Sequence, residues 1–252
     1  MTSAIKDQAV CLRCQNYSES SQIVTLFGKV SGKIRALAKG SRRGRSQFGV
    51  GMDLLNAGVV VFYPPRNDNA LATLGEFDLC ESFPLLRQNL LSLHGGQYAA
   101  EMLADFTEDF DPHEDLYDAF YLTLEHLQRH WRPEAILVTF ELTLLREVGL
   151  VPNWKSCRGC GRELSQEQRL YFSSGNGGLL CRECEGSILE KRSVDQGVLR
   201  ILQNPATIQT APRQAVINTH ELLSYHQREL LGKQSKLMVF FNQLLRQQRQ
   251  EN

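Results

Sequence analysis

The sequence predicts an α+β protein of more than one domain, with a small β-barrel first and an α-helical domain after it. Three observations favour this fold class. Short segments rich in β-branched and aromatic residues fill the first 80 residues, apolar residues recur at helical spacing after Pro84, and two Cys-x-x-Cys pairs interrupt the helical part. A chain of 252 residues is also long for one compact core.

The N-terminal segment is predicted to form short strands separated by turns. An early strand should contain Cys11, and further strands are expected at 21–27, 33–39, 58–63 and 71–79, where β-branched and aromatic residues are bounded by glycine or proline. Five short strands with few helical patterns between them suit a small closed barrel. An SH3-like barrel fits the same periodicity nearly as well as other small barrels.

Helical periodicity replaces the strand pattern after Pro84. Asp111 followed by Pro112 predicts a capped helix start, because aspartate is a preferred N-cap and proline is tolerated in the first turn. Helical patterns resume at 195–202 and again from about residue 218 to 248. The second half of the chain is therefore expected to be mainly α-helical.

Domain boundaries follow from these changes of pattern. We expect the barrel to occupy residues 1–82 and the helical domain to comprise residues 83–151 and 187–252. The cysteine-rich segment, residues 152–186, should be a module inserted into that helical domain.

Two cysteine pairs have the spacing of a single tetrahedral metal site. Each Cys-x-x-Cys forms a tight turn whose backbone amides point at the thiolates, and four thiolates complete the shell around one ion. Four cysteines leave no position open for water, so a zinc ion here would be structural rather than catalytic. A thioredoxin-like redox pair and an iron–sulfur cluster are the alternatives. The prediction is one structural Zn2+ held by Cys157, Cys160, Cys181 and Cys184.

A third Cys-x-x-Cys, formed by Cys11 and Cys14, lies in a predicted strand. Residues three apart in a strand point to opposite faces, so these two thiols should not act together. They are expected to be ordinary core or surface thiols.

Positive charge is concentrated at the start of the chain. The whole chain has a formal net charge of zero, yet residues 1–50 contain nine Lys and Arg against two acids, a net charge of +7. Alternation within strand 33–39 places its basic residues on one face, and a flexible arginine-rich loop follows. Such a surface suits contact with nucleic-acid phosphates, although a solvated face with no ligand is the alternative. The predicted DNA-binding residues are Lys33, Arg35, Lys39, Arg42, Arg43 and Arg45.

Negative charge is concentrated in residues 101–125, which contain nine acids and no Lys or Arg. Such a helical surface would repel phosphates, so nucleic acid should stay on the barrel. The acidic surface either docks a basic partner or is simply solvated.

No motif of a common enzyme class is present. The sequence lacks Walker A, Gly-x-Ser-x-Gly, His-Glu-x-x-His and Gly-x-Gly-x-x-Gly patterns. We therefore expect a binding protein rather than an enzyme. The longest apolar stretches are far shorter than the roughly 20 residues of a membrane-spanning helix, and the N-terminus lacks an apolar signal-peptide core. A cytoplasmic protein with reduced cysteines is expected.

Several segments occur in a characteristic order. They are SESSQIVTLF (18–27), GKIRALAKG (32–40), FELTLLREVGLVP (140–152), CRGCG (157–161), FS (172–173) and GGLLCREC (177–184). Together they resemble the RecO family of bacterial recombination mediators, over nearly the whole chain. The resemblance implies an N-terminal OB-fold, a helical domain and an inserted zinc ribbon.

The resemblance also implies a function. RecO-like proteins bind single- and double-stranded DNA, anneal complementary strands and, with RecR, help to load RecA onto single strands coated by single-stranded DNA-binding protein in the RecF pathway. The predicted cofactor is one structural Zn2+, and the predicted partners are DNA, RecR, single-stranded DNA-binding protein and RecA. A cytoplasmic, nucleoid-associated location follows. The alternative is a zinc-ribbon nucleic-acid-binding regulator without annealing activity.

Overall fold

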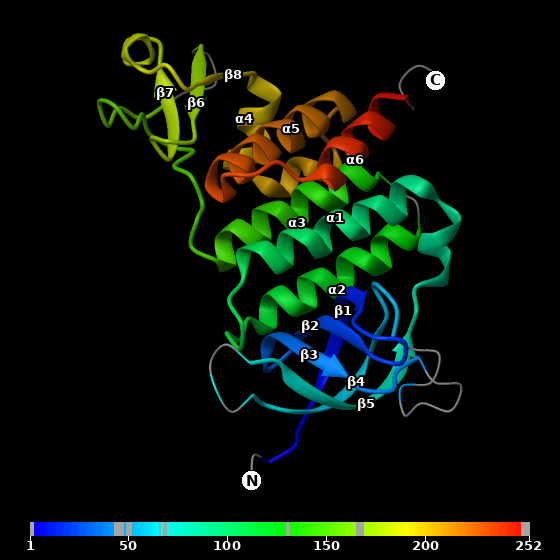
Figure 1. Cartoon of the computed structure of the whole chain (residues 1–252). Helices are drawn as coiled ribbons and strands as arrows, with labels where there is room; N and C mark the ends of the chain where they lie inside the picture. Colours follow the sequence, from blue (N-terminus) through cyan, green and yellow to red (C-terminus); the bar gives the residue numbers. More distant parts are fainter. Residues whose placement is uncertain are drawn as a thin grey trace. The chain divides into compact units, whose positions relative to one another are not determined.

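The structure is a computed structural model that describes residues 3–42, 48, 52–65, 67, 70–129, 132–164 and 169–247. The chain divides into two compact units, residues 1–131 and 132–252 (Figure 1). One hydrophobic core fills the barrel of the first unit, and another joins the cysteine segment to the helices of the second.

Five strands close the barrel in the first unit. They are β1 (Ile5–Asn16), β2 (Gln22–Gly28), β3 (Gly32–Ala38), β4 (Ala57–Tyr63) and β5 (Ala72–Glu81). Their order is β1-β2-β3-β5-β4, with β4 returning to pair antiparallel with β1 and β3 pairing parallel with β5. This closure is that of an OB-fold, which confirms the predicted barrel and decides against the SH3-like alternative.

The barrel core explains why β3 carries its charges on one face. Ile34, Ala36 and Ala38 are fully buried, whereas Lys33 is partly exposed and Arg35 is exposed. Apolar side chains of the other strands meet those of β3 inside the barrel. The alternation predicted for residues 33–39 is therefore confirmed over the described strand.

Two helices complete the first unit after a short 3-10 turn (Pro84–Gln88). They are α1 (Leu90–Phe106) and α2 (Glu114–Gln128), which pack along each other (Figure 1). Helix α1 also contacts β1. The predicted cap of α2 is wrong, because the residue before the helix is His113 and no side chain caps it. Asp111 instead accepts a hydrogen bond from His113 Nε2 at 3.1 Å.

The connection between α1 and α2 keeps Asp111 out of the cap position because it runs beside the start of β3. We call residues 107–111 the crossing segment. The amide of Phe110 donates to the Lys33 carbonyl at 2.8 Å, and Asp109 forms a parallel bridge with Lys33. Gly32, with φ of +65°, is required here because a Cβ would collide with the backbone of Asp111.

In its described residues, the second unit combines four helices with a small sheet. Its elements are α3 (Pro133–Glu147), β6 (Leu170–Ser173), β7 (Gly178–Cys181), β8 (Arg192–Val194), α4 (Gln196–Gln203), α5 (Arg213–Leu231) and α6 (Lys236–Gln247), with 3-10 turns at Glu185–Ser187 and Pro205–Gln209. Asp195 caps α4 by accepting from the Val198 amide at 2.9 Å. The helical pattern from 218 to 248 belongs to two helices, because Gly232 with φ of +63° ends α5.

A buried polar pair joins α3 to α5. His220 Nδ1 lies 3.0 Å from the Glu141 carboxylate, and both side chains are fully buried. Ser224 Oγ lies 3.5 Å from the other ring nitrogen of His220. A second charged pair joins the same two helices, because Arg213 Nε of α5 lies 3.3 Å from the buried Glu134 carboxylate of α3.

The sheet β7-β6-β8 lies between α3 and α4 in the sequence, within residues 152–194. The compact units place α1 and α2 with the barrel and α3 with the cysteine segment. The domain boundaries at 82, 151 and 187 stay a prediction. Across the described stretches of chain, no helix is both long and apolar enough to cross a membrane.

Candidate metal centre and nucleic-acid interface

The structure brings the four predicted ligand cysteines together. The Sγ atoms of Cys157, Cys160, Cys181 and Cys184 all lie within 4.8 Å of one another. The Sγ atoms of Cys160 and Cys181 are 3.9 Å apart. A tetrahedral ion with metal–sulfur bonds of ~2.3 Å requires sulfurs about 3.8 Å apart. The four cysteines therefore fit a tetrathiolate metal site, in the arrangement of a zinc ribbon.

Backbone hydrogen bonds build the two turns that carry these thiols. In the first turn, the Cys157 amide donates to the Arg162 carbonyl at 2.8 Å and the Gly161 amide donates to the Cys157 carbonyl at 2.9 Å. The amide of Arg158 donates to the Leu179 carbonyl at 2.8 Å, which ties this turn to β7. The end of β7 is Cys181 itself, so the sheet positions the second turn beside the first.

Main-chain amides favour the thiolate form of Cys157. Burial raises the pKa of this thiol, but hydrogen bonds from the amides of Cys181, Cys160 and Gly159 outweigh burial and lower the pKa to about 6. Hydrogen bonding to Cys181, followed by burial, instead raises the pKa of Cys184 to about 12. Four thiols this close cannot all ionise unaided, because each thiolate opposes the next. A dication would stabilise all four as thiolates.

The first turn needs a glycine at its centre. A Cβ at Gly159 would lie 2.8 Å from Cys184 Cβ and 2.9 Å from Cys184 Sγ. Any larger residue would therefore push the second cysteine pair away from the first. The sequence shows a Cys-x-x-Cys here, but only the structure shows that residue 159 must lack a side chain.

The metal centre is part of the core of the second unit. Cys157 and Cys181 are buried in one apolar cluster with Trp154, Phe172 and helix residues such as Leu223. The ring centroids of Trp154 and Phe172 are 5.2 Å apart. An ion at this site would hold together the sheet that shares this apolar cluster with α4 and α5, which is a structural role.

The third cysteine pair differs from the expectation. Pairing of β1 with β2 shifts register between Cys11 and Arg13, so Leu12 is an additional residue in a β-bulge. The bulge turns Cys14 to the same side as Cys11, and both pack against the barrel core. Hydrogen bonding between them raises the pKa of Cys11 and lowers that of Cys14. The prediction that the two thiols point to opposite faces is therefore wrong.

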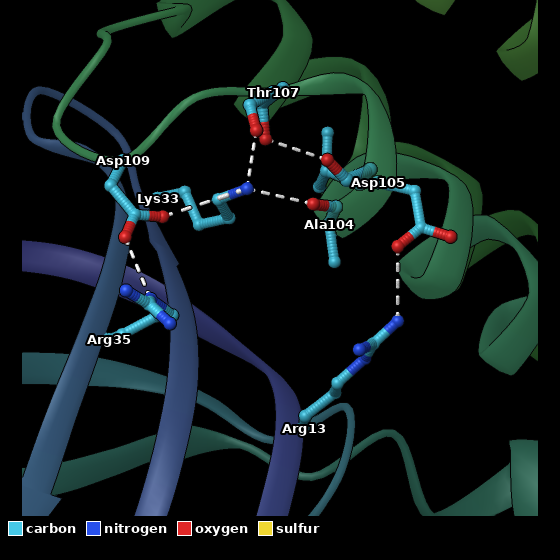
Figure 2. A network of polar contacts seen from close by, with 8 residues as sticks. Arg13, Lys33, Arg35, Ala104, Asp105, Thr107 and Asp109 are labelled. Carbon is cyan, nitrogen blue, oxygen red and sulfur yellow. Dashed lines mark hydrogen bonds and ion pairs between the residues drawn. The ribbon is translucent and has the colours of Figure 1, made fainter. Parts of the chain in front are cut away.

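Lys33, the first predicted DNA-binding residue, makes bonds within the protein. Its Nζ donates to the Ala104 carbonyl at 2.8 Å and to the Thr107 carbonyl, and it lies 3.6 Å from the Asp109 carboxylate (Figure 2). Only 14% of its side chain is exposed. Helix α1 has no basic residue in its own last turn, so Lys33 supplies the positive charge that the C-terminal end of a helix favours.

Arg35 is also paired, but at the surface. Its Nε lies 2.7 Å from Asp109 Oδ2, and 49% of its side chain is exposed (Figure 2). An exposed ion pair of this kind contributes little free energy, about 0–1 kcal/mol. A phosphate can therefore compete with Asp109 for this guanidinium group.

Further pairs join barrel cations to the acidic segment 101–125. Arg13 lies 3.3 Å from Asp105, and Lys29 lies 2.7 Å from Asp118. Part of the positive charge of the barrel is therefore neutralised within the first unit. The acidic residues involved are more than a solvated surface.

Lys39 and Arg42 differ from Lys33 and Arg35. Both are exposed, and the described part of the chain places no carboxylate within ion-pair distance of either. The turn between them is fixed to the start of β2, because Gly40 N donates to Ser21 Oγ at 3.3 Å and Arg42 N donates to the Ser20 carbonyl at 3.2 Å.

The remaining two predicted residues, Arg43 and Arg45, lie outside the described residues. The turn at residues 39–42 leads directly into the segment that contains them. We call residues 39–42 the cationic turn.

Tyr17 was not singled out by its sequence pattern. It follows β1 in the turn between β1 and β2, and the residue is 64% exposed. Its amide donates to the Ser21 carbonyl at 3.0 Å, in the same turn that holds the cationic turn. The sequence signal for this position is weak, because it consists of one aromatic residue just beyond a strand.

Two protein-family models match the chain. The model described as "Recombination protein O N terminal" matches residues 1–83, and the model described as "Recombination protein O C terminal" matches residues 87–236. The chain belongs to the RecO family. This RecO-family assignment makes it a DNA repair and recombination protein and agrees with the OB-type barrel and the four-cysteine group.

Curated relatives agree with the family matches. A RecO of Rhodopirellula baltica is 35% identical over 180 residues, which cover 71% of this chain and 66% of that protein. A RecO of Anaeromyxobacter sp. strain K is 32% identical over 201 residues, covering 79% and 77%. A RecO of Alkaliphilus metalliredigens is 32% identical over 198 residues, covering 78% of each. All three are named DNA repair protein RecO.

Proposed function

We propose that this RecO-family chain is a non-catalytic mediator that binds DNA through the cationic turn of its barrel and anneals complementary strands. The observation that carries the proposal is the pair Lys39 and Arg42, two exposed cations without carboxylate partners among the described residues, on a turn anchored to an OB-type barrel. Two further arginines, Arg43 and Arg45, follow in the sequence. Such a turn can follow a phosphate backbone without reading bases.

The six predicted residues then have different roles. Lys39, Arg42, Arg43 and Arg45 contact phosphates directly. Arg35 contributes once a phosphate displaces Asp109, because the pair is exposed and weak. Lys33 positions the crossing segment and contacts no DNA, since its ammonium donates to the Ala104 and Thr107 carbonyls.

Annealing follows from charge neutralisation. Two single strands repel each other through their phosphates, and a cationic surface that holds both reduces this repulsion and raises the chance of pairing. Family membership supports partnership with RecR and help in loading RecA onto single strands covered by single-stranded DNA-binding protein. A cytoplasmic location at the nucleoid follows from this role.

The four-cysteine group holds one structural Zn2+ in this proposal. The donor set of four thiols in two tight turns suits zinc, and the sulfur separations fit its bond lengths. The ion stabilises the sheet of the second unit and takes no part in DNA chemistry. Replacing Cys157 by Ser should therefore release the metal and unfold the second unit.

Strand annealing tests the proposal. Two complementary labelled oligonucleotides are mixed with the full-length protein, and the approach to duplex is followed by energy transfer. We expect the protein to speed annealing, and to do so equally for strand pairs of unrelated sequence. The rate should return towards that measured without protein when Arg42, Arg43 and Arg45 are all replaced by Gln. Tight binding of one sequence without annealing would contradict the proposal and favour a regulator. Metal-dependent cleavage of the strands would contradict the non-catalytic assignment.

A further inference from the structure

Tyr17 stands out among the aromatic residues of the barrel. Phe27, Phe62 and Phe77 are buried in the core, whereas Tyr17 and Tyr63 are exposed among the described barrel residues, at 64% and 44%. A ligand that covers an exposed aromatic ring removes apolar surface from water, which favours binding. The ring of Tyr17 can act in this way on a nucleic acid only if it lies close to the cationic turn.

Backbone contacts place Tyr17 next to the cationic turn. The turn between β1 and β2 (residues 17–21) is closed by the hydrogen bond from the Tyr17 amide to the Ser21 carbonyl at 3.0 Å. The same turn accepts the Arg42 amide at the Ser20 carbonyl and the Gly40 amide at Ser21 Oγ. The exposed ring and the exposed cations therefore belong to two turns that are hydrogen-bonded to each other.

The other end of β3 offers no such combination. There, the crossing segment covers Lys33, and at the middle of the strand Arg35 is paired with Asp109. Nucleic acid that follows the positive charge is thus directed to the end of the barrel where Tyr17, Lys39 and Arg42 lie. OB-folds in general bind oligonucleotides on the face of strands 2 and 3 and in the loop between strands 1 and 2.

We propose that Tyr17 is a base-stacking residue, which makes the cationic turn a site for single-stranded nucleic acid in preference to duplex. The proposal rests on the DNA-binding function proposed above. The ring of a tyrosine stacks on any base whose face is free, and in a duplex those faces are covered by neighbouring base pairs. Lys39 and Arg42 hold the phosphates of the same strand.

Affinity measurements on three variants test this role. Fluorescence anisotropy is recorded for a labelled single strand and for its duplex, across a salt series, with wild-type protein, Tyr17→Ala, Tyr17→Phe and Tyr63→Ala. Tyr17→Ala should weaken single-strand binding by at least about fivefold, because stacking contributes substantially per base. Its salt dependence should keep the wild-type slope, since the tyrosine contacts no phosphate. Duplex affinity should stay within about twofold, which is the scale of a neutral surface change.

The conservative and matched variants separate stacking from other causes. Tyr17→Phe keeps the ring and should bind like wild type, and Tyr63→Ala removes the other exposed ring and should leave both affinities unchanged. Equal losses for single strand and duplex, or an equal loss from Tyr63→Ala, would overturn the proposal. Wild-type affinity of Tyr17→Ala for the single strand would also overturn it. Failure of the wild-type protein to bind either DNA would instead refute the proposed function itself.

Discussion

The ammonium of Lys33 donates a hydrogen bond to the main-chain oxygen of Ala104 at 2.8 Å, which joins the third barrel strand to the last turn of α1 (Figure 2). The same ammonium also binds the Thr107 carbonyl. The alternation in the sequence places Lys33 on the face predicted to bind nucleic acid. In the structure, Lys33 instead binds the carbonyl groups at the C-terminal end of α1, within the first unit.

Replacing Lys33 by Met should destabilise the first unit by about 1–3 kcal/mol, because the carbonyls of the buried residues Ala104 and Thr107 lose a charged donor. Urea unfolding measures the loss. Lys39→Met removes an equivalent charge from an exposed position and should change stability by less than about 0.5 kcal/mol. Equal stability of the two variants would contradict the structural role of Lys33.

Replacing Asp109 by Asn should strengthen DNA binding. The change removes the charge that neutralises Arg35 but keeps an acceptor oxygen for its Nε. We expect affinity for a single strand at low salt to rise by about two- to fivefold, the range of an exposed ion pair. Glu108→Gln is the matched control, since Glu108 is the adjacent exposed acid and makes no ion pair among the described residues. A similar rise in both variants would show a general charge effect and not competition for Arg35.

Much of this fold could be predicted because its signals are local. The alternation in β3, the start of α4 at Asp195 and the two cysteine pairs each depend on residues a few positions apart. The roles of Lys33 and Glu141 could not be predicted, because their partners, at Ala104 and His220, lie 71 and 79 residues further along the chain. Periodicity reports which face a residue occupies but carries no information about a distant partner.

The bulge in β1 shows a second limit. One additional residue, Leu12, reverses the expected relation between Cys11 and Cys14, and nothing in the alternation of β1 marks it. The cap of α2 failed for a related reason. Asp111 has the right sequence context, but pairing of Phe110 with Lys33 holds the backbone outside the helix.

Replacing Gly159 by Ala should lower the metal content of the purified protein. The new methyl group would lie within 2.9 Å of Cys184 Cβ and Sγ, so the second cysteine pair must move. We expect the variant to lose most of its bound metal and the second unit to unfold at lower temperature. Gly186→Ala provides the control, because a Cβ at Gly186 meets no atom within 4 Å. Full metal content in Gly159→Ala, measured by atomic emission, would contradict the geometry of the site.

Stability of the second unit should fall in mild acid through His226. Burial lowers the pKa of this imidazole below its ordinary value of 6.5, and its Nδ1 lies 2.7 Å from Ser174 Oγ. The unfolded chain therefore binds the proton first as pH falls. The contribution of His226 to stability is complete above the unfolded pKa and is lost as pH falls towards the folded pKa.

His226→Gln should remove this contribution. When the pH is lowered from about 7.5 to about 5.5, the free energy of unfolding of the wild-type protein should fall by up to about 1 kcal/mol more than that of the variant, as measured by urea unfolding. Both proteins have the same four cysteines, so any loss of stability from metal release at low pH is the same in both. The difference between the two proteins therefore reports His226 alone. An identical pH dependence of wild type and His226→Gln would rule out His226 as the titrating group.

DNA binding by the cationic turn and by the arginines that follow it in the sequence is the central claim, and a salt titration tests it most directly. Anisotropy of a labelled single strand is followed with wild-type protein and with Arg42, Arg43 and Arg45 all replaced by Gln. We predict tight binding by the wild-type protein at low salt. The slope of log affinity against log salt concentration should become shallower by about 2 in the variant, because each of three lost phosphate contacts accounts for about 0.7. Absence of binding at low salt, or an unchanged slope in the variant, would contradict the account.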